Sequence, residues 1–206
     1  MFDLLELQKS FILMCLKDGD VCADFTMGNG HDTLFLSQTV GKNGHVYAFD
    51  IQRSALESTY QRLNDAGCVD NCTLINDSHS NLKNYINCKI KAGMFNLGYL
   101  PGSGDKTVTT MRKTTLPAVK DALSILDSNS ILLVAVYPGH AEGAKEGKEL
   151  DEFFKTLDRR CVSVSKFQIV NSPTSPFFFV AQTGKLSVSE YIDKNGSMYE
   201  KSEECV

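Results

Sequence analysis

The residues of this sequence that could bind a ligand begin with a glycine-containing turn, "ADFTMGNGHDT", at residues 23–33. Gly28 and Gly30 follow an apolar run and precede a helical pattern. Glycine has no Cβ atom and adopts positive φ, so a ligand can lie against the backbone, where the first helical amides offer donors. The third glycine of the dinucleotide fingerprint is missing, so the turn suits a ligand other than a pyrophosphate.

An acidic residue lies about 20 residues further on, at the distance typical of a ribose-binding carboxylate. Asp50 ends the apolar run "HVYAFD" at 45–50. A carboxylate at the end of a strand can accept hydrogen bonds from ribose hydroxyls. The glycine turn and Asp50 together indicate a ribose-bearing ligand.

A second candidate for chemistry is "FNLGYLPG" at 95–102, which also follows an apolar run. The side-chain carbonyl of Asn96 can accept a hydrogen bond from an acceptor nitrogen, and Tyr99 can stack on a flipped-out base. These residue types suit the positioning of such a nitrogen.

The scaffold that must position these residues is predicted by the alternation of short apolar runs with helical patterns from Val21 onward. The predicted strands are 21–25, 45–50, 72–76, 90–96, 130–137, 161–170 and 177–183. The predicted helices are 31–40, 53–66, 106–126 and 142–158, with weaker helical character at 80–88. The linker "NSPTSP" has no room for a crossover helix, so the last two strands should form a hairpin. The predicted fold is α/β and Rossmann-like, a seven-stranded mostly parallel sheet with an antiparallel C-terminal hairpin and helices on both faces.

Length and composition indicate one globular domain. The chain has 206 residues, 42% of them hydrophobic and 22% charged. We expect a domain over 1–185 with an amphipathic helix in 1–20, then a polar tail over 186–206 with a short helix near 187–193. The net charge of −4 excludes the basic field of a protein that coats duplex nucleic acid, although a local patch could hold a small one.

The cysteines and the N-terminus bear on location. Seven cysteines are scattered without a C-x-x-C pair, which indicates reduced thiols and no metal site. The N-terminal segment lacks the basic region and cleavage site of a signal peptide and is too short and too charged to span a membrane. We therefore expect a cytoplasmic protein without a membrane partner.

The motifs together resemble one family. The segments "DFTMGNGHDTLFL", "VYAFDIQ", "NDSHSNL" and "MFNLGYLPGSGDKTVTT" occur in this order. They are similar to a small bacterial family long labelled putative rRNA methylases and more recently understood as tRNA (5-aminomethyl-2-thiouridine) methyltransferases. The resemblance covers about residues 1–184. It implies a class I methyltransferase fold, S-adenosylmethionine as cofactor, and methyl transfer to the aminomethyl nitrogen of the modified wobble uridine.

The same resemblance implies which residues line the cofactor pocket. Asp24 matches the acidic position of the first methyltransferase motif, and Gln52 lies where it could reach the purine. His79 is also open to a simpler interpretation, as a loop residue that forms local hydrogen bonds. The expected cofactor residues are Asp24, Gly28, Asn29, Gly30, Asp50, Gln52, Asp77, Ser78, His79 and Asn96.

The acceptor side is predicted from the "NLGY" sequence, which resembles the N-P-P-Y motif of amine methyltransferases with both prolines replaced. The expected catalytic residues are Asn96, Tyr99 and Asp32. The expected substrate-binding residues are Tyr99, Lys106, Arg112, Tyr137 and His140. The basic residues among them either meet anticodon-loop phosphates or belong to a solvated loop. The group that takes a proton from the acceptor amine is left open among Asp32, His31, Tyr137 and His140.

Three alternatives remain open from the sequence: an NAD-dependent oxidoreductase, a non-catalytic nucleotide-binding module, and a methyltransferase acting on rRNA or a small amine. The missing third glycine and the terminal hairpin count against the first. The presence of Asn96 and Tyr99 counts against the second. The family-specific motif favours tRNA over the third, and we expect the tRNA anticodon loop as partner and a homodimer as assembly.

Overall fold

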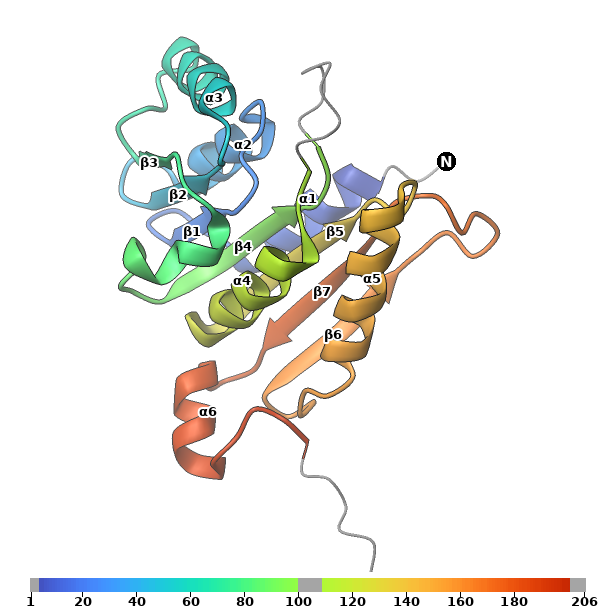
Figure 1. The fold of residues 1–206 in the computed structure, drawn as a ribbon. Coiled ribbons are helices and arrows are strands. Elements are labelled where there is room, and N and C mark those ends of the chain that lie inside the picture. Colours follow the sequence, from blue (N-terminus) through green and yellow to red (C-terminus); the bar gives the residue numbers. More distant parts are fainter. Residues whose placement is uncertain (1–3, 100–108, 201–206) are drawn as a thin grey trace, which may run out of the picture.

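The computed structural model describes residues 4–99 and 109–200, and within them the chain forms one seven-stranded sheet with helices on both faces (Figure 1). The strand order is β3-β2-β1-β4-β5-β7-β6. The strands are β1 (Val21–Asp24), β2 (His45–Phe49), β3 (Cys72–Ile75), β4 (Ile90–Asn96), β5 (Leu126–Val136), β6 (Val162–Phe167) and β7 (Phe177–Thr183). All seven predicted strands are present.

The helices follow the predicted segments closely. They are α1 (Leu4–Cys15), α2 (His31–Val40), α3 (Arg53–Asp65), the 3₁₀ helix η1 (His79–Asn84), α4 (Arg112–Ser124), α5 (Ala141–Phe154) and α6 (Val188–Asn195). The start of the helix predicted at 106–126 falls partly outside the described residues, and α4 begins at Arg112. None of these helices is both long and apolar enough to cross a membrane.

The hairpin prediction is confirmed, and the structure adds the order of its strands. β7 pairs antiparallel with both β5 and β6, so the antiparallel strand lies inside the sheet and β6 forms the edge. The other neighbouring pairs are parallel. The sheet therefore reverses strand order between β1 and β4, and ligands bind at such a reversal, outside the carboxyl ends of the strands.

β5 begins earlier than predicted, at Leu126 rather than at residue 130. Leu126 pairs with Ile90, and the regular ladder resumes only at Ile131. Between them the pairing is irregular, and Asn129 has a φ of 49°. Polar residues in this irregular stretch concealed the start of the strand from the sequence pattern.

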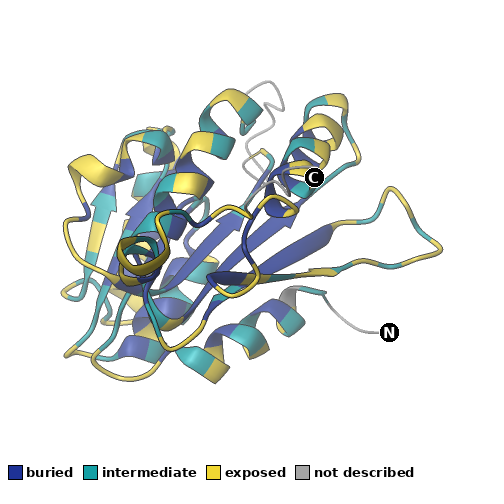
Figure 2. Ribbon diagram, turned by 90° about the horizontal axis from the view of Figure 1, so that it is seen from below, coloured by how far each residue is buried: buried dark blue, intermediate teal, exposed yellow. Residues whose placement is uncertain are grey.

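The core lies on both faces of the sheet, and Figure 2 shows the strands as a buried layer between helices whose outer faces are exposed. On one face, Ile12 of α1 and Leu36 of α2 pack against β1, β4 and β5. On the other, α4, α5 and η1 contribute Val119, Leu150 and Leu82. This two-sided burial explains why the central strands read as continuous apolar runs.

The segment after Lys185 contributes buried contacts that its polar composition does not indicate. Ser187 caps α6 in a reciprocal capping box with Glu190. Val188 and Tyr191 are buried in the same core as α4 and α5, and the Tyr191 hydroxyl donates to Asp158 Oδ2 at 2.8 Å. Residues 187–198 are thereby attached to the domain in the structure.

Candidate active site

The glycine turn between β1 and α2 has the backbone that its sequence predicts. Gly28 and Gly30 have φ values of 50° and 77°, a conformation that side chains with a Cβ rarely adopt. A Cβ atom at Gly30 would lie 2.8 Å from the Cα atom of Thr59. Glycine is thus required at residue 30 both by its φ and by the close approach of α3.

Two residues of α3 that the sequence did not single out hold this turn. The Thr59 hydroxyl donates to the Gly28 carbonyl at 3.1 Å, and Arg62 Nε donates to the Asn29 carbonyl at 2.7 Å. Arg62 also contacts His31 Nε2 at 3.1 Å, and because a guanidinium only donates, that nitrogen accepts. Their spacing of three residues on one helix was the available signal, but nothing in the sequence pairs α3 with the turn.

Asp50 lies at the carboxyl end of β2, beside the turn. Its Oδ2 accepts from the Gly28 amide at 3.1 Å and its Oδ1 from the Gln52 amide at 2.9 Å. Burial raises the pKa of Asp50, and these backbone bonds oppose the rise. Each carboxylate oxygen keeps a second lone pair, so Asp50 can still accept from the hydroxyls of a ribose.

Asp24 at the end of β1 is fully buried and braces the turn from below. Its Oδ2 accepts from the Thr33 hydroxyl at 2.7 Å and its Oδ1 from the Thr26 amide at 3.1 Å. Burial, followed by the nearby charge of Asp32, raises the pKa of Asp24 to about 7. Asp24 bonds to residues on both sides of the turn and so holds its backbone in place.

Asn96 at the end of β4 is held in one orientation. Its Nδ2 donates to Asp32 Oδ2 at 2.5 Å, and its backbone amide donates to the Thr26 hydroxyl at 2.7 Å. Among the described residues, the buried Oδ1 of Asn96 has no hydrogen-bond partner. An unpaired buried carbonyl is costly, so a donor that reaches it from a ligand would gain a hydrogen bond.

The segment after β3 divides into an outer and an inner part. Asp77 accepts from the Ser78 amide and from Asn81 and Tyr85, and these bonds, Tyr85 first, lower its pKa. Ser78 caps η1. His79 is buried, donates from Nδ1 to the Phe25 carbonyl at 3.1 Å, and has a lowered pKa because of burial.

The neutral ring of His79 therefore presents a lone pair at Nε2, which is buried and without a partner among the described residues. The simpler interpretation of His79 as a loop residue with a local bond accounts for Nδ1 but not for this atom.

Tyr99 and His140 lie on the acceptor side, beyond β4 and β5. Tyr99 forms an antiparallel bridge with Thr109, is 41% exposed, and has its ring centroid 6.4 Å from that of His140. His140 caps α5, since its Nδ1 accepts from the Gly143 amide at 3.1 Å. A neutral His140 ring must then carry its proton on Nε2, which makes it a donor rather than a base there.

The other predicted substrate-binding residues do not lie together in one place. Lys106 lies outside the described residues. Arg112 begins α4 and forms ion pairs with Glu149 at 2.9 Å and Glu142 at 3.6 Å, so its guanidinium is engaged by α5. Tyr137, which follows β5, packs partly buried against the α1 side of the core, and its Cδ2 would lie 4.0 Å from a Cβ at Gly98.

Glu146 of α5 is a buried carboxylate. It is 1% exposed, and burial raises its pKa. It precedes Leu150 by four residues and so falls on the apolar stripe of that helix, which was the available signal.

These residues fit an S-adenosylmethionine-sized ligand by two observations. The glycine turn, with positive φ at Gly28 and Gly30, lies beside the carboxylate of Asp50, which can still accept hydrogen bonds. Nε2 of His79, in the segment after β3, is buried and has no partner among the described residues. The structure thus gathers Asp24, the turn, Asp32, Asp50 and Asn96 at one edge of the sheet.

Comparison with known proteins gives consistent matches. A family model described as "Putative rRNA methylase" matches residues 46–183. The "tRNA (mnm(5)s(2)U34)-methyltransferase, chloroplastic" of Arabidopsis thaliana is 37% identical over 174 residues, which cover 78% of this chain and 62% of that protein. This chain therefore matches less than two thirds of the length of that relative.

Two crystal structures are similar over nearly their whole length. A "putative rRNA-methylase" from Clostridium thermocellum has a TM-score of 0.86 and 38% identity, with 89% of this chain and 98% of that chain covered. A "putative methyltransferase" from Streptococcus mutans, in complex with SAH, has a TM-score of 0.80 and 34% identity, with 89% and 99% covered.

Proposed function

This chain belongs to the family described as putative rRNA methylases, and from that premise we propose that it methylates the aminomethyl nitrogen of 5-aminomethyl-2-thiouridine, or its 2-oxo form, at the tRNA wobble position. The predicted family and the class I methyltransferase fold are confirmed by these matches. The cofactor is S-adenosylmethionine, as predicted, in agreement with the SAH-bound neighbour. The tRNA substrate is supported by the name of the 37% identical relative.

The observation that carries the proposal is the fixed amide of Asn96. Asp32 accepts a hydrogen bond from Nδ2 of Asn96, so Oδ1 of Asn96 is the atom that a ligand would meet. A carbonyl oxygen can accept a hydrogen bond from an amine N–H and turn the nitrogen lone pair toward the methyl donor. In this proposal Asn96 is a catalytic residue, and Asp32 is a positioning residue that acts through it.

The cofactor residues have separate roles. When bound, S-adenosylmethionine supplies an electrophilic methyl group on a sulfonium sulfur. Asp50 would accept from the ribose hydroxyls, and the turn at Gly28–Gly30 would let the ligand approach the backbone. Gln52, Ser78 and His79 lie on the loops after β2 and β3, where the adenine would bind.

The acceptor side requires a neutral amine with an available lone pair. An alkylamine is mostly protonated at neutral pH, so binding must select the neutral form or remove a proton. His31 and His140 each use one ring nitrogen to accept a bond within the protein. We therefore assign His140 Nε2 as a donor to the substrate, and Tyr99 as the surface on which the base stacks.

The test is nucleoside mass spectrometry of tRNA that lacks the methyl group, after incubation with this protein and S-adenosylmethionine. The proposal expects one added methyl group on 5-aminomethyl-2-thiouridine, abolished in Asp50→Ala and Asn96→Ala. Transfer to rRNA or to a small amine instead would reject the substrate while keeping the enzyme class. The proposal also includes a homodimer that holds the anticodon loop, and a cytoplasmic location. Light scattering with and without tRNA tests the dimer and its binding to tRNA.

A further inference from the structure

We propose that Glu146 is a positioning residue for methyl transfer, which acts by fixing the chain segment that pairs with Tyr99. The inference rests on the proposed function. It adds a residue of α5, outside the cofactor turn and the Asn96 amide, to the residues on which the reaction depends.

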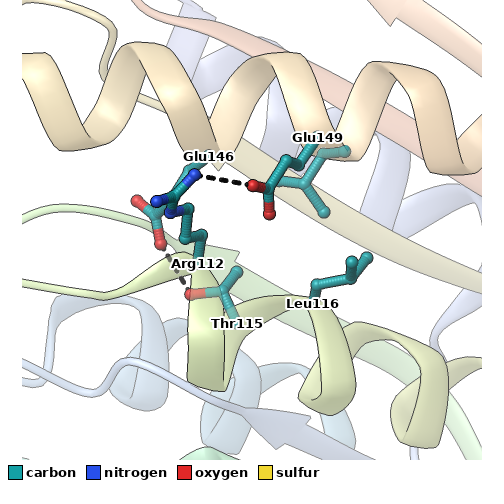
Figure 3. A pocket seen from close by; sticks show the side chains of 6 residues that line it. Arg112, Thr115, Leu116, Glu146 and Glu149 are labelled. Carbon is teal, nitrogen blue, oxygen red and sulfur yellow. Dashed lines mark hydrogen bonds and ion pairs between the residues drawn. The ribbon is translucent and has the colours of Figure 1, made fainter.

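Both carboxylate oxygens of Glu146 accept hydrogen bonds from threonine hydroxyls. Its Oε1 accepts from the Thr115 hydroxyl at 2.6 Å, shown in Figure 3, and its Oε2 from the Thr110 hydroxyl at 3.0 Å. Arg112, the nearby cation, pairs with Glu142 and Glu149 instead. A buried carboxylate without a direct cationic partner is costly, and an apolar residue would fill the contact between α4 and α5 without that cost.

Thr110 connects this carboxylate to the acceptor side. Its backbone amide donates to the Gly98 carbonyl at 2.9 Å, and the preceding residue, Thr109, forms the antiparallel bridge with Tyr99. Gly98 and Tyr99 follow Asn96 by two and three residues. The contacts therefore run from Glu146 through Thr110 to the backbone that carries Tyr99.

The neighbouring glutamates of α5 hold the same segment. Glu142 and Glu149 lie four residues before and three residues after Glu146, on one face of the helix, and both pair with Arg112. These ion pairs are partly exposed and contribute little. The bond between the buried carboxylate of Glu146 and Thr110 is therefore the contact whose loss should move the segment.

The experiment compares variants that remove one hydroxyl bond each. Thr110→Val and Thr115→Val both delete a donor to Glu146, but only Thr110 is bonded to Gly98. Glu146→Gln keeps the shape and can still bond to both hydroxyls, but it replaces the charge-assisted hydrogen bonds by weaker neutral ones. We expect Glu146→Gln and Thr110→Val to lower kcat/KM for tRNA about tenfold, with the Kd for S-adenosylmethionine unchanged within about twofold. Thr115→Val should lower Tm about as much as Thr110→Val does, but it should lower kcat/KM less.

Glu152→Gln is the matched control, because this carboxylate lies on the same helix with its side chain 64% exposed. It should match the wild type. Equal kinetic losses in Thr110→Val and Thr115→Val, or a lowered Tm with unchanged kinetics in Glu146→Gln, would overturn the positioning role. A wild-type protein that transfers no methyl group to tRNA would reject the proposed function, and the inference with it.

Discussion

In the proposed reaction, a single hydrogen bond to Asp32 sets the orientation of the Asn96 amide. An amide has one donor end and one acceptor end, and a carboxylate accepts only. Asp32 therefore selects the orientation in which Oδ1 of Asn96 is available. Without Asp32, nothing in this pair would fix which end of the Asn96 amide is left to accept.

Asp32→Asn tests this dependence. An asparagine at residue 32 can donate as well as accept, so Asn96 could bind it in either orientation. We expect kcat to fall about 100-fold, the loss typical of a misplaced acceptor, while calorimetry gives an unchanged Kd for S-adenosylmethionine. An activity within about twofold of wild type would mean that Asp32 does not orient the amide.

The buried carboxyl of Asp24 predicts a pH-dependent stability. Its pKa is raised in the folded protein to about 7, mainly by burial and then by the charge of Asp32. In the unfolded chain it is about 3.9, so between these values the native state binds more protons than the unfolded state. The stability contributed by this site is therefore greatest at low pH and falls as pH rises from about 4 to about 7.

The measurement is Tm against pH for wild type and Asp24→Asn, which keeps the shape but cannot ionise. The Tm of the wild type relative to the variant should decrease across that window and level off above it. A constant difference would show that Asp24 is ionised throughout. Thr33 and Thr26 can bond to an asparagine as well, so the variant is expected to fold.

At the scale of elements, α3 acts as a clamp on the glycine turn. Arg62→Ala removes the bond to the Asn29 carbonyl, and we expect the Kd for S-adenosylmethionine to rise about tenfold. Arg53→Ala is the control, because Arg53 lies on the same helix and pairs with the exposed Glu57. Calorimetric titration of both variants checks the prediction, and equal affinities would remove α3 from the site.

The elements themselves were largely predictable, because apolar runs and helical periodicity report burial directly. All seven strands and the helices on both faces follow from that pattern. The irregular start of β5 was not predictable, since its polar residues interrupt the apolar run. The burial of α6 was not predictable either, because two of its eight side chains, Val188 and Tyr191, are buried and the segment is otherwise mostly polar.

The site was predictable only where a residue follows its own strand. Asp24 and Asn96 end strands and Asp50 directly follows one, and parallel strands bring their carboxyl ends to one edge of the sheet. Thr59, Arg62 and Glu146 act through contacts between segments more than 30 residues apart. No local pattern encodes such a contact, so these residues emerge only from the structure.

At the scale of the whole molecule, the cofactor turn is built from separate parts of the chain, so ligand binding must be coupled to folding. The turn follows β1, Asp50 follows β2, Thr59 and Arg62 lie on α3, and Asn96 ends β4. A ligand that requires all of them binds the native state and not the unfolded chain. It stabilises the fold by an amount set by its concentration relative to its Kd.

S-adenosylmethionine at 100 times its Kd should therefore stabilise the protein by about 2.7 kcal/mol. For a chain of this size that corresponds to a rise in Tm of about 5 to 10 °C, measured by differential scanning calorimetry. Asp50→Ala should lose most of the rise, because in the proposed function its carboxylate accepts hydrogen bonds from the ribose. Asn96→Ala should keep it, because its role is toward the acceptor nitrogen. If both variants lost the rise equally, Asn96 would belong to the cofactor pocket, and the acceptor amine would have to be oriented by another group.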